Sequence, residues 1–249
     1  MTAVIFAGPT LPPNARPADT TAFDWRPPVR QGELYRVALD RPAVIGIIDG
    51  YFETTPTVWH KEILWAMAQG IHVFGAASIG ALRAAELDVF GMRGIGRIYD
   101  DFRSGVLEDD DEVAVLHGPA ELGYPSVTEA MINIRATLAA AARDGIIAPS
   151  TADRLTAIAK ALFYKERTWQ ATLGAAAASN GDEAALARFE AWLPAGQVDQ
   201  KRRDALAMLE AIATHLAAGT QPLQVDYELA DTAAWRAVRR RVDGDEWLK

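Results

Sequence analysis

The stretch GIHVFGAASIGALRAAEL, residues Gly70–Leu87, decides how the first half of this chain folds. It begins with a short apolar run and continues into a helical pattern, with a turn of small residues between the two. The polar side chain of that turn is Ser78, and Gly75 and Gly80 stand on either side of it. The order of strand, tight turn and helix predicts that Ser78 lies where a strand ends and a helix begins.

The same alternation of short apolar runs with helical patterns continues through the first half of the chain. The predicted strands are rich in Val, Ile and Ala and lie at residues 3–8, 43–49, 71–77 and 112–118. The helical patterns lie at residues 55–70, 78–91 and 95–105, and Thr57 is the expected N-cap of the first. Strands that are apolar on both faces and alternate with helices predict an α/β core with a parallel-type sheet.

The second half of the chain is mainly helical. Residues 12–30 are rich in proline and predict an extended loop, whereas long alanine-rich helical patterns occupy residues 127–145, 150–169 and 200–219. We therefore expect two domains. Residues 1–120 form the α/β core that carries the site, and residues 121–249 form a helical region packed on it and available to partners.

Composition excludes several classes of function. Lys and Arg number 25 against 33 Asp and Glu, and the net charge of −8 argues against binding nucleic acid or an anionic membrane. We find no apolar run of about 18 residues and no signal-peptide pattern, so we expect a cytoplasmic protein. The absence of cysteine excludes disulfides, thiolate zinc sites and cysteine nucleophiles. The four histidines lack metal-ligand spacing, and we expect neither a metal nor another cofactor.

Ser78 has two interpretations. A serine between a strand and a helix resembles the nucleophile elbow of acyl-transfer enzymes, in which small neighbours allow the backbone to turn sharply around the hydroxyl. The amides at the start of the helix would then stabilise an oxyanion. Alternatively, the hydroxyl is an ordinary helix N-cap.

A nucleophilic serine needs a base, and no Asp–His pair stands out in the sequence. Lys61 lies in the helix between the second and third predicted strands and is the first candidate. To accept a proton it must be neutral near pH 7, which requires burial. The alternative is that Lys61 belongs to a solvated helix face, and Lys165 is the second lysine to test.

Other candidates lie at the predicted carboxyl ends of strands or in nearby helices. The residues expected to bind substrate or hold an oxyanion are Gly8, Thr10, Asp49, His60 and Arg83. Arg83 also has Glu86 within reach across one helical turn. The acidic run at residues 108–112 predicts a cation site, a basic partner or a solvated loop. Arg167 and Trp169 are candidates for a contact surface.

Taken together, several motifs resemble the TfuA family. They are VIFAGPTL, IGIIDGYFETTPTVWHKEILWAMAQGIHVFGAASIGALRAAELDVFGMRGIGRIYDDFRSG and DDDEVAVLHGP, which cover roughly residues 3–118. Their joint order is specific to the family, although no single motif is. The family usually has serine where this chain has Thr10. A hydroxyl is therefore kept at this position, but it is a secondary alcohol and not a primary one.

This resemblance implies an accessory hydrolase for peptide backbone thioamidation by a YcaO enzyme. It implies a Ser–Lys pair, which Ser78 and Lys61 match, and hydrolysis of the C-terminal thiocarboxylate of a ThiS-like sulfur carrier. It also implies binding to that carrier and to YcaO, and an increased affinity of YcaO for its peptide substrate. Two alternatives remain open: a non-catalytic adaptor between YcaO and its peptide, and a nucleotide-binding accessory that uses the AGPT loop. The peptide, the carrier and the oligomeric state stay undetermined at this stage.

Overall fold

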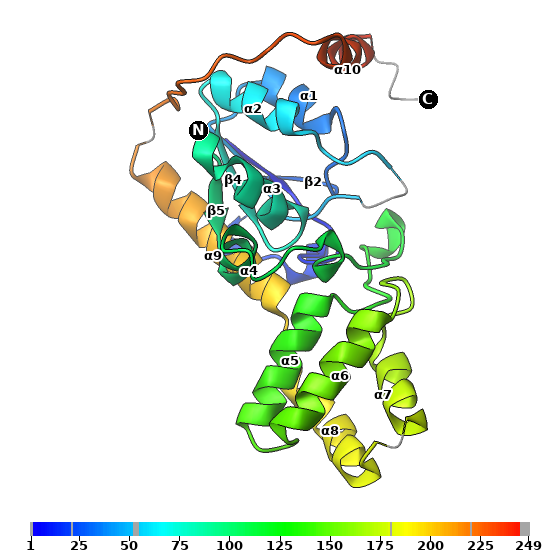
Figure 1. Ribbon diagram of the computed structural model, residues 1–249. Coiled ribbons are helices and arrows are strands. Elements are labelled where there is room, and N and C mark those ends of the chain that lie inside the picture. The colour runs from blue at the N-terminus through cyan, green and yellow to red at the C-terminus, as the bar shows by residue number, and fades with distance from the viewer. Residues whose placement is uncertain (1, 21, 52–54, 180, 220, 245–249) are drawn as a thin grey trace. The chain divides into compact units, whose positions relative to one another are not determined.

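The computed structural model describes residues 2–20, 22–51, 55–179, 181–219 and 221–244. By their internal contacts the residues form two compact units, one within residues 1–108 and 202–249 and the other within residues 109–201 (Figure 1). The chain thus leaves the first unit and returns to it. The domains expected at residues 1–120 and 121–249 stay a prediction, because compactness does not show which parts fold independently.

The first unit is built on a sheet in which every described pair of neighbouring strands is parallel. The strand order is β2–β1–β3–β4–β5. The strands are β1 (Ala3–Phe6), β2 (Asp24–Arg26), β3 (Val44–Ile47), β4 (His72–Ala76) and β5 (Arg93–Ile95). This arrangement confirms the predicted fold class, a parallel α/β core in the first half followed by a mainly helical second half.

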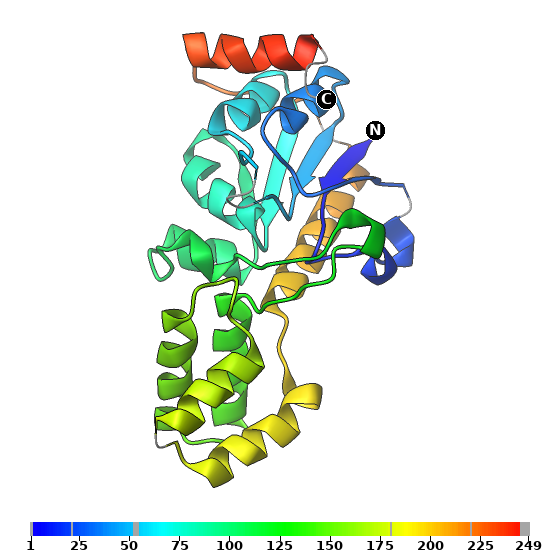
Figure 2. The same ribbon diagram turned by 90° about the vertical axis from the view of Figure 1, so that its right-hand side faces the viewer.

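The two faces of the sheet bury alternate residues of the same strands. Val4 and Phe6 pack on the side of α1 (Glu33–Leu39), α2 (His60–Ala68) and α3 (Ile79–Leu87). Ala3 and Ile5 pack on the opposite side, where α9 (Gln200–Ala217) supplies Met208 and its apolar neighbours. Figure 2 shows α9 along one face of the strands and the N-terminal helices along the other. The late helix α9 therefore completes the core of the first unit.

Two short strands were missed and one predicted strand does not form. β2 lies inside the proline-rich segment predicted as a loop, and β5 precedes α4 (Arg97–Arg103). Both are edge strands of three residues with half-exposed side chains, so neither has a long apolar run. Residues 112–118 are not a strand. There the carbonyl of Val113 accepts a hydrogen bond from Lys201 Nζ, at 2.8 Å.

In the described part of the second unit, four α-helices form a bundle. They are α5 (Met131–Arg143), α6 (Pro149–Ala161), α7 (Trp169–Ala178) and α8 (Glu183–Gly196). Their apolar faces share one core around Leu138, Leu155 and Phe189. The last helix of the chain, α10 (Ala233–Asp243), belongs to the first unit. None of the described helices is both long enough and apolar enough to cross a membrane.

Candidate functional site

The corner between β4 and α3 has a strained backbone. Ala77 has φ +66°, in the left-handed region that residues with a Cβ rarely adopt. The amide of Ser78 donates to the carbonyl of Ala76 at 2.8 Å, which is the hydrogen bond of a γ-turn centred on Ala77. Backbone strain of this kind is retained where the surrounding structure requires it, and it often marks a functional site.

Ser78 occupies the N-cap position of α3, but its hydroxyl makes no capping hydrogen bond. The side chain is 3% exposed and has no hydrogen-bond partner among the described residues. By contrast, Thr168 caps α7 by accepting from the amide of Ala171 at 3.0 Å. The interpretation of Ser78 as an ordinary capping serine is therefore wrong, and its hydroxyl is left for another use.

Close packing explains the small residues around Ser78. A Cβ on Gly80 would lie 1.8 Å from the carbonyl oxygen of Ile47, and one on Gly75 would lie 2.1 Å from that of Gly80. Both distances are far below van der Waals contact, so no other residue fits. The start of α3 is consequently pressed against the ends of β3 and β4.

The amide groups at the start of α3 are partly used. Gly80 donates its N–H to the carbonyl of Ile48 at 3.3 Å, which fixes the helix start to the residue after β3. The amide of Ile79 has no acceptor within the described part of the chain. In acyl-transfer sites of the nucleophile-elbow type, the amide after the nucleophile contributes to the oxyanion hole. Ile79 is in that position.

Three of the predicted residues meet at the ends of β1 and β3. The buried carboxylate of Asp49 accepts the amides of Gly8 and Thr10 through Oδ2, at 2.9 and 3.0 Å. Its Oδ1 accepts the Thr10 hydroxyl at 2.6 Å. The amides of Gly8 and Thr10 are thus bound to a carboxylate and do not point to an oxyanion. Asp49 instead fixes the loop after β1 beside the serine corner.

His60 and Arg83 meet at a different place. His60 Nε2 lies 2.9 Å from Glu86 Oε2, and Arg83 donates to the same oxygen at 2.6 Å. Burial by itself raises the pKa of Glu86, but the hydrogen bonds from His60 and Arg83 and the charge of Arg83 outweigh it and lower the pKa. Glu86 lies eight residues beyond Ser78, or about two helical turns. This cluster therefore joins the start of α2 to the far part of α3.

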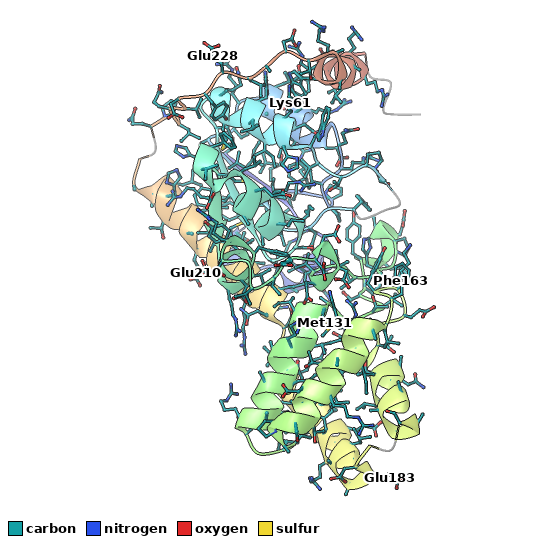
Figure 3. The ribbon with its side chains drawn as sticks, in the orientation of Figure 1. Lys61, Met131, Phe163, Glu183, Glu210 and Glu228 are labelled. Carbon is teal, nitrogen blue, oxygen red and sulfur yellow. The ribbon has the colours of Figure 1, made fainter. Side chains whose placement is uncertain are left out.

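Lys61 is not in contact with Ser78. It lies on α2, where Figure 3 labels it. Its Nζ donates to the carbonyl of Ala230 at 2.5 Å and to the hydroxyl of Thr232 at 3.2 Å. Both acceptors lie just before α10, and no hydrogen bond joins Lys61 to the described residues of the serine corner. The predicted pair of nucleophile and base is consequently not assembled in this structure.

The candidates of the second unit have structural partners. Arg167 is fully buried and binds the carboxylate of Asp111 at 2.6 Å, so its assignment to a contact surface is wrong. Glu112 accepts two hydrogen bonds from Arg135, each 2.9 Å long. Three of the five acidic residues of the run, Asp109, Asp111 and Glu112, form ion pairs with Lys160, and no cluster suited to a metal ion occurs among the described residues. Lys165 Nζ lies 5.4 Å from the ring centroid of Tyr164, and Lys165 stays a prediction as the alternative base.

Two features had no clear signal in the sequence. The strained conformation of Ala77 depends on how α3 is pressed against the sheet, and alanine itself gives no indication of it. Glu62 is fully buried within the HKEIL motif, where its carboxylate accepts amide hydrogen bonds from Gly32, Tyr35 and Trp59. The neighbouring residue Lys61 is the one that the sequence predicts as a base, whereas Glu62 holds α1 against α2.

Fold and site together define a class of protein. It is a three-layer parallel α/β protein with an uncapped serine hydroxyl where a strand turns into a helix, next to a carboxylate-bound loop. Residues 49–168 match the model of a family described as TfuA-like protein, and the chain belongs to this family.

The matched residues overlap only partly with the motifs that resemble the family. The match begins at Asp49, so Gly8 and Thr10 lie outside it, and it continues through α5 and α6 of the second unit. Ser78 and Lys61 lie inside it. A comparison with curated proteins found no match to this sequence.

Proposed function

We propose that this TfuA-like protein is a hydrolase that uses Ser78 to release sulfide from the C-terminal thiocarboxylate of a ThiS-like sulfur carrier. The released sulfide would serve YcaO-dependent thioamidation of a peptide backbone. The observation that carries the proposal is the Ser78 hydroxyl, which is buried at a strained corner and makes no capping bond. The proposed substrate class is the one that the resemblance to the TfuA family implies.

The chemistry requires a single covalent intermediate. Ser78 Oγ attacks the thiocarboxylate carbon and gives its proton to Lys61, the predicted base. The amide of Ile79 stabilises the oxyanion, and the C–S bond breaks as Lys61 passes the serine proton to the sulfur, which leaves as hydrosulfide. Water then attacks the acyl-serine ester, so the carrier leaves as a carboxylate and the serine recovers its proton. The absence of cysteine agrees with release by acyl chemistry, since no persulfide can form on this chain.

Sulfide release by the purified protein from a thiocarboxylated carrier, without YcaO, tests this proposal. We expect turnover by the natural protein and a loss of at least about 100-fold in Ser78→Ala, because no other group at the corner can form the ester. Ser104→Ala is the matched control, since the Ser104 hydroxyl bonds only to the carbonyls of Asp100 and Asp101 in the preceding helix, α4. Equal rates in the two folded variants would remove Ser78 from the mechanism.

The second candidate function is a non-catalytic adaptor that strengthens YcaO's binding of its peptide. The position of Lys61 favours it, because the predicted base is held by Ala230 and Thr232 instead of by the serine. The adaptor predicts no sulfide release and full enhancement of peptide binding by Ser78→Ala. The hydrolase with an additional binding role predicts release by the natural protein, and enhancement that survives the substitution. Sulfide release by the natural protein separates the two, because both predict that the enhancement of peptide binding survives Ser78→Ala.

A further inference from the structure

The segment before α10 follows α2 in the reverse direction. Near the end of α2, Leu223 donates its amide to the carbonyl of Gly70 at 2.9 Å. In the middle, the Tyr227 hydroxyl donates to the carbonyl of Leu64 at 2.7 Å. At the start of α2, Lys61 holds the carbonyl of Ala230. Residues 221–232 contain no helix or strand, so these contacts on α2 define their course (Figures 1 and 2).

α10 then closes over the beginning of the same helix. Its apolar side, formed by Trp235, Val238 and Val242, packs with Tyr35, Trp59 and Trp65. The ring centroids of Trp235 and Tyr35 are 5.3 Å apart in an edge-to-face contact. We call residues 221–243 the C-terminal clasp. It holds both residues that flank His60: Trp59 through α10 and Lys61 through its amine.

Lys61 lies at the joint of this clasp. Its amine binds Thr232 Oγ1, and the same oxygen accepts the amide of Trp235 at 3.3 Å as the N-cap of α10. One amine therefore connects α2 to the point where α10 begins. While both contacts last, the amine is held at the joint of the clasp and not at Ser78.

We propose that the clasp is an autoinhibitory device that keeps Lys61 away from Ser78 until it opens. This inference rests on the proposed function, since it assigns regulation to the same Ser–Lys pair. Opening removes both acceptors from the Lys61 amine and frees Trp59, so the start of α2 can move toward the serine corner. The lysine stem is flexible, so the amine can follow such a movement.

Trypsin provides a direct measure of clasp opening. α10 carries four arginines, Arg236, Arg239, Arg240 and Arg241, and cleavage at them requires the helix to leave its position and unwind. When closing is fast compared with cleavage, the initial rate reports the population of the open form. Mass spectrometry of the shortened chain identifies these sites among all others.

Thr232→Ala removes the hydroxyl shared by Lys61 and α10, and we expect the rate of cleavage within α10 to rise about fivefold. Lys61→Met removes the amine and should have a similar effect. Lys61→Arg keeps donors for both oxygens and should retain the natural cleavage rate. The matched control is Thr214→Ala, whose hydroxyl bonds only to the carbonyl of Glu210 in its own helix.

Sulfide release separates the regulatory role from a purely structural one. We expect Thr232→Ala to release sulfide about threefold to fivefold faster than the natural protein, because more molecules have a free Lys61. In Lys61→Arg the clasp should close as in the natural protein, yet the variant should release almost no sulfide. Natural cleavage rates in both Thr232→Ala and Lys61→Met would overturn the clasp, and faster cleavage without faster sulfide release would overturn its inhibitory role.

The same measurements show whether the proposed function has failed instead. If Ser78→Ala still releases sulfide, the serine mechanism is wrong, whatever the cleavage rates show. If Ser78→Ala is inactive and Thr232→Ala is no faster than the natural protein, the hydrolase stands and the inhibitory clasp does not.

Discussion

At the scale of single residues, Ser78 shows that a position on a helix does not fix a role. Serine is a common N-cap, yet here the hydroxyl makes no bond to the amides of α3. The preceding residue, Ala77, turns the backbone in a way that directs the start of the helix against the sheet. Ser78 is a buried residue, and helix capping does not explain why a hydroxyl is kept there.

Substituting Ser78 should therefore cost little stability. We expect Ser78→Ala to change the free energy of unfolding by less than about 0.5 kcal/mol, because no capping bond is lost. Thr168→Ala, which removes a true cap from α7, should cost about 1 kcal/mol. Urea unfolding of the two variants measures the contrast. A loss from Ser78→Ala as large as that from Thr168→Ala would mean that the serine caps α3 after all.

At the scale of helices and strands, a single carboxylate connects α1 to α2. Glu62 accepts the amide of Gly32 at 2.8 Å, at the N-cap of α1, and that of Trp59 at 3.0 Å, at the N-cap of its own helix. Burial raises the pKa of Glu62 to about 7, and the three amide hydrogen bonds only partly oppose this. The connection between the two helices thus titrates near neutral pH.

This connection predicts an uncommon pH dependence. The pKa of Glu62 is higher in the folded state than its ordinary 4.5, so the folded chain binds more protons between pH 4.5 and 7. Its contribution to stability therefore falls as the pH rises through this window, by up to about 3 kcal/mol. Urea unfolding at pH 5 and pH 8 measures the loss.

Glu62→Gln is the control for that measurement, because its amide does not titrate. We expect the variant to be less stable than the natural protein at pH 5 but to lose less stability on going to pH 8. If both proteins lose the same amount, the pH dependence arises elsewhere and Glu62 is ionised throughout.

At the scale of the whole molecule, the two units are stabilised in different ways. The first is a parallel sheet with apolar residues on both faces. The second has an apolar helix core and, beside it, a charged network in which Arg167 donates to the carboxylate of Asp111 and to the carbonyls of Ala159 and Leu162. Damage to that network should consequently affect the second unit.

Arg167→Met tests this difference. It removes the guanidinium donor from the carbonyls of Asp111, Ala159 and Leu162 and from the Asp111 carboxylate, and we expect the second unit to lose about 3 kcal/mol. Arg143→Met is the control, since Arg143 is 72% exposed and its ion pair with Asp144 should contribute little. Hydrogen exchange should show lost protection in α6 but not in β1, β3 and β4. Equal loss in both units would mean that they unfold as one.

The sequence by itself determined the class of the fold and the position of the serine. Strands buried on both faces must be apolar along their whole length, so the runs at β1, β3 and β4 are visible in the sequence without the structure. The glycines on either side of Ser78 are also visible in the sequence, although Gly80 is required by the carbonyl of Ile47 on the neighbouring strand. The apolar runs and the order of strand, turn and helix are properties of a few consecutive residues.

The tertiary structure alone decided which of the candidate residues meet. Asp49 and Gly8 are 41 residues apart, and Lys61 and Ala230 are 169 apart, yet each pair shares a hydrogen bond. Side-chain chemistry made Lys61 a reasonable base, but its environment comes from a segment at the other end of the chain. Such contacts depend on how distant elements pack, and no local pattern records that packing.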